Sequence, residues 1–103
     1  MGKYWISKWK VMKIPKTVKV GNITYNIKRE DHDGYHGIHY YNDNDNDILL
    51  NTKLTGDKLR DVFFHELTHA ILHQMGADEE NENEVFVQAL ANSLNNIFEL
   101  KTN

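Results

Sequence analysis

The chain has 103 residues, enough for one hydrophobic core, and it contains no cysteine. Disulfide bonds and thiolate metal sites are therefore excluded, and any bound metal must be held by nitrogen and oxygen atoms. We expect a single domain that spans residues 1–103. The sequence has no apolar run long enough for a signal peptide or a membrane-spanning helix, so we expect a cytoplasmic protein without a membrane partner.

The net charge is −3, but the charges are divided unevenly along the chain. Residues 1–29 hold eight lysines or arginines and no acid, whereas residues 30–103 hold four bases and fifteen acids. This division indicates a basic strand layer that lies against an acidic helical layer. The alternative is that the lysines near Trp5 and Trp9 contact nucleic acid or an acidic partner. Because no nucleic-acid-binding motif accompanies them, we do not expect nucleic acid to be the partner.

The first half of the chain predicts a small sheet. Residues 1–15 mix aromatic and basic residues and predict a basic arm or an edge strand. A hairpin follows, because alternating apolar residues flank the turn signal Gly21-Asn22: they are Val18, Val20, Ile23, Tyr25 and Ile27. Residues 29–34 predict a polar loop, and strand patterns return at residues 35–41 and 48–51.

Residues 42–46 read Asn-Asp-Asn-Asp-Asn, which imitates the start of a calcium-binding EF-hand loop. The rest of that loop is missing, because Ile48 stands where the tight turn needs glycine and Leu54 stands where a bidentate glutamate is needed. We therefore predict a solvated turn.

The second half of the chain predicts two helices. The first runs from about Gly56 to Met75, with Thr55 as its N-cap and Gly76 as its C-terminal cap. Residues 77–83 predict an acidic linker. The second helix runs from about Glu82 to Leu100, with an apolar stripe along one side: Val87, Leu90, Ala91, Leu94, Ile97 and Phe98. The expected fold is α+β, with a small antiparallel or mixed sheet of three or four strands packed with these helices.

The first predicted helix contains the sequence His65-Glu66-Leu67-Thr68-His69. Histidines four residues apart share one face of a helix, so both imidazoles can point at one ion. Glu66 lies about 100° round the helix from His65, where it can reach a metal-bound water without filling a coordination site. This is the H-E-x-x-H signature of metallopeptidases, with two zinc ligands and a general base. The alternative of ordinary core or surface histidines is disfavoured, because a helix so apolar all round makes unliganded polar side chains costly.

Catalytic zinc needs a third protein ligand, and Glu84 is the best placed residue. It opens the second helix at the edge of the apolar stripe, so packing that stripe on the first helix brings its carboxylate toward the two histidines. Glu79, Glu80 and Glu82 are rivals, although acids at these positions also serve simply as solvated groups or as favourable charges near a helix start.

His73 is a poor ligand candidate because it lies a full turn beyond His69. Three collinear histidines on one straight helix cannot converge on a tetrahedral ion. We expect His73 to be either a partly buried imidazole or one that supports the ligands from outside the coordination sphere.

Residues 59–94 resemble the active-site region of gluzincin metallopeptidases. His65 to Ala70 is similar to the thermolysin-type active-site helix in its variable positions too, and Asn83-Glu84 is similar to the Asn-Glu that opens that family's glutamate helix. The chain length is similar to that of the very small single-domain gluzincins found among phage and prokaryotic proteins. The resemblance implies a zincin-like fold, Zn²⁺ on His65, His69 and Glu84, and Glu66 as the base acting on a peptide or protein substrate.

Two features depart from that family. The acid that orients a ligand histidine, four residues after the ligand glutamate, is here Gln88, which can accept from an imidazole with less charge assistance. The C-terminal subdomain that supplies a transition-state donor is missing. Candidate donors lie in the strand region before the helix: Tyr35, His36, His39 and Tyr40.

The expected function is zinc-dependent peptide-bond hydrolysis by a metal-bound water that Glu66 activates. One alternative is a non-catalytic, zinc-stabilised binding module that uses the basic N-terminal arm. Another is a structural protein without a metal.

Overall fold

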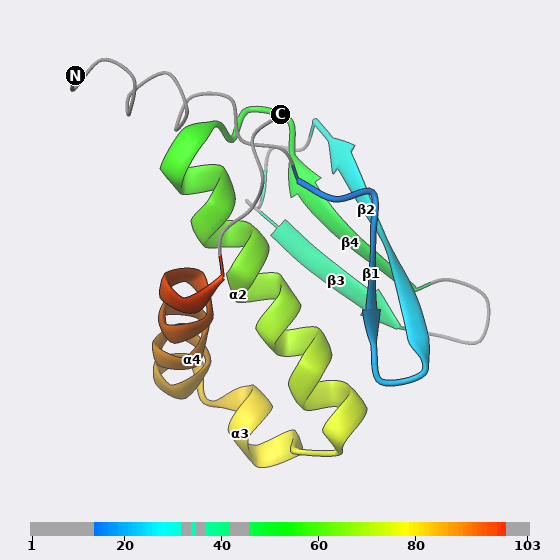
Figure 1. The fold of residues 1–103 in the computed structure, drawn as a ribbon, viewed down its shortest axis with the longest axis vertical. Coiled ribbons are helices and arrows are strands. Elements are labelled where there is room, and N and C mark those ends of the chain that lie inside the picture. Colours follow the sequence, from blue (N-terminus) through cyan, green and yellow to red (C-terminus); the bar gives the residue numbers. More distant parts are fainter. Residues whose placement is uncertain (1–13, 32–33, 35–36, 42–45, 99–103) are drawn as a thin grey trace.

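The structure is a computed structural model that describes residues 14–31, 34, 37–41 and 46–98. The elements follow one another as β1 (Thr17–Val20), β2 (Ile23–Glu30), β3 (Gly37–Tyr41), β4 (Asn46–Asn51), α2 (Gly56–Met75), α3 (Asp78–Glu82) and α4 (Glu84–Ile97). One sheet lies beside a group of helices, as Figure 1 shows, so the expected α+β class is confirmed.

The four strands form one mixed sheet in the order β1-β2-β4-β3. β1 and β2 are the predicted antiparallel hairpin, and Val20 pairs with Ile23 across a turn in which Gly21 has a φ of 62°. This left-handed conformation favours glycine, which explains the turn signal. β2 pairs in parallel with β4, and β3 pairs antiparallel with β4 at the edge of the sheet.

The predicted loop at residues 29–34 begins too early, because β2 continues through Arg29 to Glu30. Both residues pair with the end of β4, where Glu30 lies opposite Asn51. The Arg29 guanidinium donates to the main-chain oxygens of Asn51, Thr52 and Leu54 at 3.1, 3.3 and 2.8 Å. Arg29 therefore holds the connection between β4 and α2 in place, a role that a polarity pattern does not reveal.

Other predictions for the first half of the chain are tested only in part. The predicted arm or edge strand lies outside the described residues except for Ile14 and Pro15, which are not in a strand. Residues 35–36 and 42–45 of the predicted strand and turn also lie outside them. β4 begins at Asn46, two residues before the predicted strand, and pairs there with Tyr41.

α2 has the predicted bounds and the predicted C-terminal cap. Gly76 adopts a left-handed φ of 73°, and its N–H is directed to the carbonyl oxygens of Leu72 and His73. Thr55 occupies the predicted N-cap position, although its side chain makes no capping hydrogen bond.

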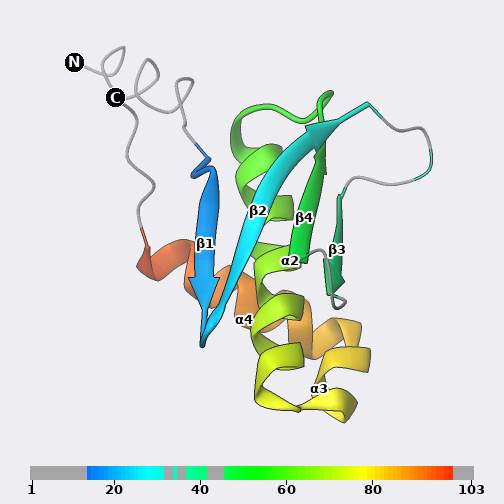
Figure 2. The ribbon, with the colours of Figure 1, turned by 90° about the vertical axis from the view of Figure 1, so that its right-hand side faces the viewer.

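α2 is the central helix, because the sheet lies on one side of it and α4 on the other (Figures 1 and 2). Its apolar side chains are buried around most of the circumference, as the sequence predicted: Leu59, Val62, Phe63, Phe64, Ala70 and Leu72. In the part of the chain that the structure describes, no helix is long and apolar enough to cross a bilayer.

The segment after α2 differs from the prediction. The expected linker contains the short helix α3, and α4 begins at Glu84 rather than at about Glu82. Asn83 separates the two helices, since its ψ is 97° and its side-chain oxygen accepts from the Phe86 N–H at 3.1 Å. An asparagine is a strong N-cap, so it starts a new helix at this point.

The apolar stripe of α4 is covered as far as Leu94 but not at the end of the helix. Val87 and Ala91 are fully buried, whereas Ile97 and Phe98 are 71% and 55% exposed. The predicted stripe is therefore wrong for its last two members, because α4 ends at Ile97 and the chain leaves the helix there.

Arg60 links α2 to the last turn of α4. Its guanidinium donates to the side-chain and main-chain oxygens of Asn95 and to the main-chain oxygen of Phe98, and its carbon lies 5.7 Å from the centre of the Phe64 ring. The last carbonyl groups of a helix lack donors within the helix and attract positive charge. Although Arg60 is only 9% exposed, these partners satisfy its charge.

We predict that Arg60→Ala lowers the free energy of unfolding by about 2–3 kcal/mol, because it removes charged hydrogen bonds and leaves carbonyl oxygens without a donor. Urea denaturation measures this change. Lys58→Ala, an exposed change on the same helix, should alter stability by less than about 0.5 kcal/mol. Equal losses in the two variants would contradict the linking role of Arg60.

Candidate metal centre

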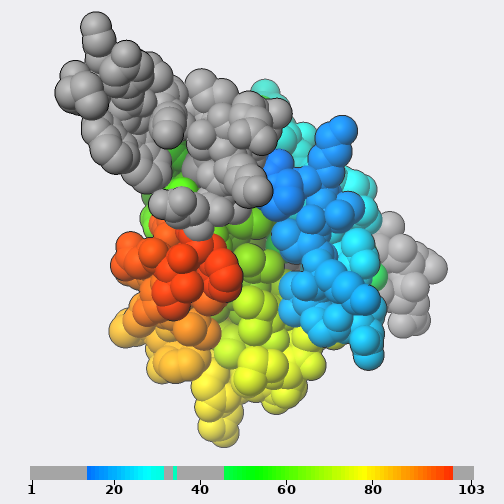
Figure 3. Space-filling model, viewed as in Figure 1, coloured from blue at the N-terminus to red at the C-terminus, as the bar shows by residue number. Residues whose placement is uncertain are grey.

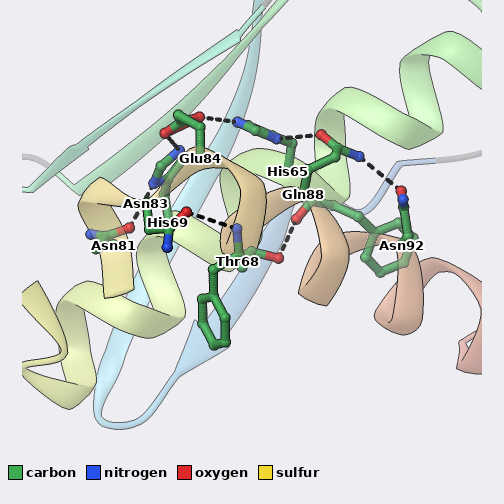
Figure 4. A network of polar contacts seen from close by, with 10 residues as sticks. His65, Thr68, His69, Asn81, Asn83, Glu84, Gln88 and Asn92 are labelled. Atoms are coloured by element: carbon green, nitrogen blue, oxygen red, sulfur yellow. Dashed lines mark hydrogen bonds and ion pairs between the residues drawn. The ribbon is translucent and has the colours of Figure 1, made fainter. Parts of the chain in front are cut away.

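The candidate centre lies where the first turn of α4 meets the middle of α2. His65 and His69 lie on adjacent turns of α2, with 4.9 Å between ring centroids. Glu84 is the first residue of α4, and its Oε1 lies 3.1 Å from His65 Nε2 while its Oε2 lies 3.3 Å from His69 Nε2. The three side chains point toward one another in Figure 4, so the N-cap at Asn83 and the packing of α4 together bring the carboxylate between the imidazoles.

These three side chains have the types and spacing of a metal site. One ligand atom from each of His65, His69 and Glu84 can be chosen so that all lie within 4.8 Å of one another. Ligands at about 2.1 Å from a tetrahedral zinc ion lie about 3.4 Å apart, close to the two distances from Glu84. The arrangement can therefore accept a single ion with small side-chain adjustments.

The other nitrogen of each imidazole faces an amide oxygen. His65 Nδ1 lies 2.8 Å from Gln88 Oε1, and His69 Nδ1 lies 2.6 Å from Asn81 Oδ1. Gln88 Nε2 donates in turn to Asn92 Oδ1 at 2.8 Å, which fixes the oxygen as the atom that faces His65 (Figure 4). Because an amide oxygen can only accept, these contacts favour the tautomer in which Nδ1 of each ring carries the proton.

The position of the proton on each ring determines whether Nε2 can bind a metal. A neutral imidazole with its proton on Nδ1 presents a lone pair at Nε2, the form that binds metals. Here two such lone pairs face a carboxylate, so three electron-pair donors converge. Without a cation, each contact between an Nε2 atom and a carboxylate oxygen would need a proton between the two atoms. A divalent cation matches this donor set better, because it is attracted by all three groups.

The centre is partly open to solvent on its glutamate side. The side chains of His65 and His69 are 23% and 15% exposed, whereas that of Glu84 is 63% exposed. The histidines are thus held by packing, while an ion or a small ligand can approach past Glu84.

Glu66, the predicted base, is not one of the three clustered side chains and is only 8% exposed. Few glutamates are so buried. It follows His65 directly, so its side chain points about 100° round the helix from that imidazole. Thr68, inside the same motif, is fully buried and donates to the Phe64 carbonyl at 2.7 Å, so its hydroxyl serves the helix itself.

The structure separates Glu84 from its rivals. Glu79, Glu80 and Glu82 lie on α3, where all three are exposed, and none belongs to the clustered group. His73 is also exposed, which makes the prediction of a partly buried imidazole wrong. It lies in the last turn of α2, beyond the part of the helix that α4 covers at its first turn.

The structure describes the backbone of only two of the four residues predicted as candidate transition-state donors. Tyr35 and His36 lie outside the described residues. His39 and Tyr40 lie on β3, opposite Ile48 and Asp47 of β4. β3 is the edge strand nearest to α2 (Figure 1), so this backbone runs close to the helix that carries the histidines.

Asn81 and Asn92 are contributors that the sequence pattern did not reveal. Asn81 lies in what looks like an acidic linker, and no spacing rule connects it with His69. Only the turn of α3 brings its amide back to α2. Asn92, at four residues after Gln88, could have been found as a helical neighbour of that side chain.

Searches against models of protein families, curated proteins and solved structures found no match to this chain.

We expect Glu84→Ala to lose stoichiometric Zn²⁺ binding, because it removes the carboxylate that lies between the two imidazoles. Glu82→Ala removes an exposed acid two residues away and should bind zinc as the unchanged chain does. Calorimetric titration with zinc and elemental analysis of untagged protein measure both variants. Equal zinc binding by both would exclude Glu84 as a ligand.

The amide side chains of Gln88 and Asn81 should affect the affinity for zinc but not the number of zinc ions bound. Gln88→Ala and Asn81→Ala should each weaken zinc binding by about 10–100-fold, since each leaves one imidazole without its orienting acceptor. Gln88→Glu should restore or exceed the original affinity through a charged acceptor. Asn96→Ala, on an exposed position of α4, is the control. Unchanged affinity in Gln88→Ala and Asn81→Ala would show that the amides do not act through the histidines.

Proposed function

We propose that the protein is a zinc-dependent peptide hydrolase of the gluzincin type, with a zincin-like fold. The observation that carries the proposal is the convergence of two imidazole Nε2 atoms from the H-E-x-x-H helix α2 and both oxygens of one carboxylate from α4. The protonated Nδ1 atoms, held by amide oxygens, support it further.

The donor set favours zinc over the common hard cations. Calcium and magnesium prefer oxygen ligands, whereas two imidazoles and one carboxylate suit zinc. Some iron oxygenases use the same three ligand types. The glutamate directly after the first histidine, Glu66, favours hydrolysis, because that reaction needs a proton acceptor near the ion.

In this proposal the residues of the centre have separate roles as metal ligands, orienting groups and base. His65, His69 and Glu84 hold the ion, and Gln88 and Asn81 keep the imidazoles in the metal-binding tautomer. A bound zinc ion supplies Lewis acidity, which acidifies water and polarises a carbonyl group. Glu66 takes the proton from the attacking water and delivers it to the leaving amine.

The edge strand β3 suits an extended peptide substrate. Among the described residues β3 pairs on one side only, with β4, and it lies beside α2 (Figure 1). A peptide can add to such an edge through main-chain hydrogen bonds. His39 and Tyr40, on this strand, are the described candidates for a donor to the transition state.

We predict that Glu66→Gln keeps one zinc ion per chain and loses peptide cleavage by about 100-fold or more, because an amide cannot accept the proton. A fluorogenic peptide library measures cleavage, and elemental analysis measures zinc. Asp61→Asn, an acid on the same helix outside the centre, should retain both properties.

Two results would contradict the mechanism. Full activity of Glu66→Gln would remove the base from the reaction. Zinc binding with no cleavage by the unchanged chain on any peptide would favour the non-catalytic, zinc-stabilised module that uses the basic N-terminal arm.

A further inference from the structure

An apolar groove of about 680 Å³ lies between β1 and α2. Figure 3 shows it as the hollow between β1 and the end of α4, with α2 as its floor. Its main apolar side chains come from three elements: Val18, Val20, Phe63, Leu67, Ile71 and Phe98. On a helix, Leu67 and Ile71 lie on the side opposite His65 and His69, so the groove is separate from the candidate metal centre.

The apolar side chains of the groove are incompletely covered by the described residues. Met75 and Phe98, at its edges, are 71% and 55% exposed, and Leu67 and Ile71 are only half-buried. A contiguous apolar surface of this kind marks a contact with another segment or molecule. The volume lies within the range of about 300–1,000 Å³ found for ligand pockets.

An apolar segment directly precedes the groove residues in the sequence. Pro15 lines the groove and Ile14 packs against the core, and residues 1–13 come before them in the chain. Those residues hold six apolar or aromatic side chains within nine positions: Tyr4, Trp5, Ile6, Trp9, Val11 and Met12. Trp9 is five residues from Ile14, within reach of about 17 Å of extended chain.

We propose that residues 4–12 of the same chain dock in this groove through their apolar side chains. The described lining contains Lys19 and no acidic residue, so it favours aromatic and aliphatic groups rather than the lysines of the segment. Lysine stems can lie along an apolar rim while their charged ends stay in water. The lysines of the segment thus keep a strongly apolar docking sequence soluble.

The two tryptophans give a direct test, because the chain has no others. Tryptophan fluorescence of the full chain therefore reports on residues 5 and 9 alone. We expect blue-shifted emission and a several-fold lower acrylamide quenching constant than in a peptide of residues 1–13, independent of protein concentration. Quenching equal to that of the peptide would overturn the proposal.

Paired variants locate the docking site. Met75→Gln combined with Phe98→Gln changes two exposed groove residues and should shift emission and quenching toward the values of the peptide. Val85→Gln combined with Ile97→Gln changes two residues that are 81% and 71% exposed and do not line the groove, and it should leave both unchanged. Far-UV circular dichroism checks that all variants are folded.

Three other results would overturn the proposal. Equal effects of the two double variants would place the segment elsewhere. Tryptophan burial that appears only at high protein concentration would mean that a second copy supplies the segment. Exposed tryptophans that become protected only on adding nucleic acid would assign the segment to that partner.

Discussion

The carboxylate of Glu84 lies between the Nε2 atoms of His65 and His69, and this contact depends on how α4 packs on α2. Three electron-pair donors do not attract one another, so their approach has to be imposed by packing or compensated by a cation. The fully buried side chains of Val87 and Ala91 impose it from α4, close to the carboxylate. The centre is therefore assembled by the core of the protein, and an added cation would reinforce that core.

The two ends of α4 are held by different interactions. Asn83 caps its start and places Glu84 in the first turn, whereas Arg60 of α2 binds the carbonyl groups at its end. α3 adds the amide of Asn81, which orients His69 from the side opposite Glu84. α4 is thus positioned along its whole length against α2, and both imidazoles are orientated by neighbours on the later helices.

The two long sides of α2 have separate roles in this arrangement. One side carries the histidines and meets α4, while the other contributes the floor of the apolar groove beside β1. The proposed hydrolase chemistry and the proposed docking of residues 4–12 therefore do not compete for the same surface. Docking would cover apolar side chains of the helix that holds the centre, so it would stabilise the centre without blocking it.

The sequence by itself determined the local features, because hairpin turns, helix caps and H-E-x-x-H spacing depend on residues close together in the chain. It predicted the hairpin at Gly21-Asn22, the bounds of α2 and the shared face of His65 and His69. It also ranked Glu84 above Glu82 as the third ligand, and the packing of α4 brings that carboxylate to the histidines. Only the tertiary structure decided the parallel pairing of β2 with β4 and the contact of Asn81 with His69. These features depend on how distant segments pack, and that packing cannot be predicted from periodicity or from spacing along the chain.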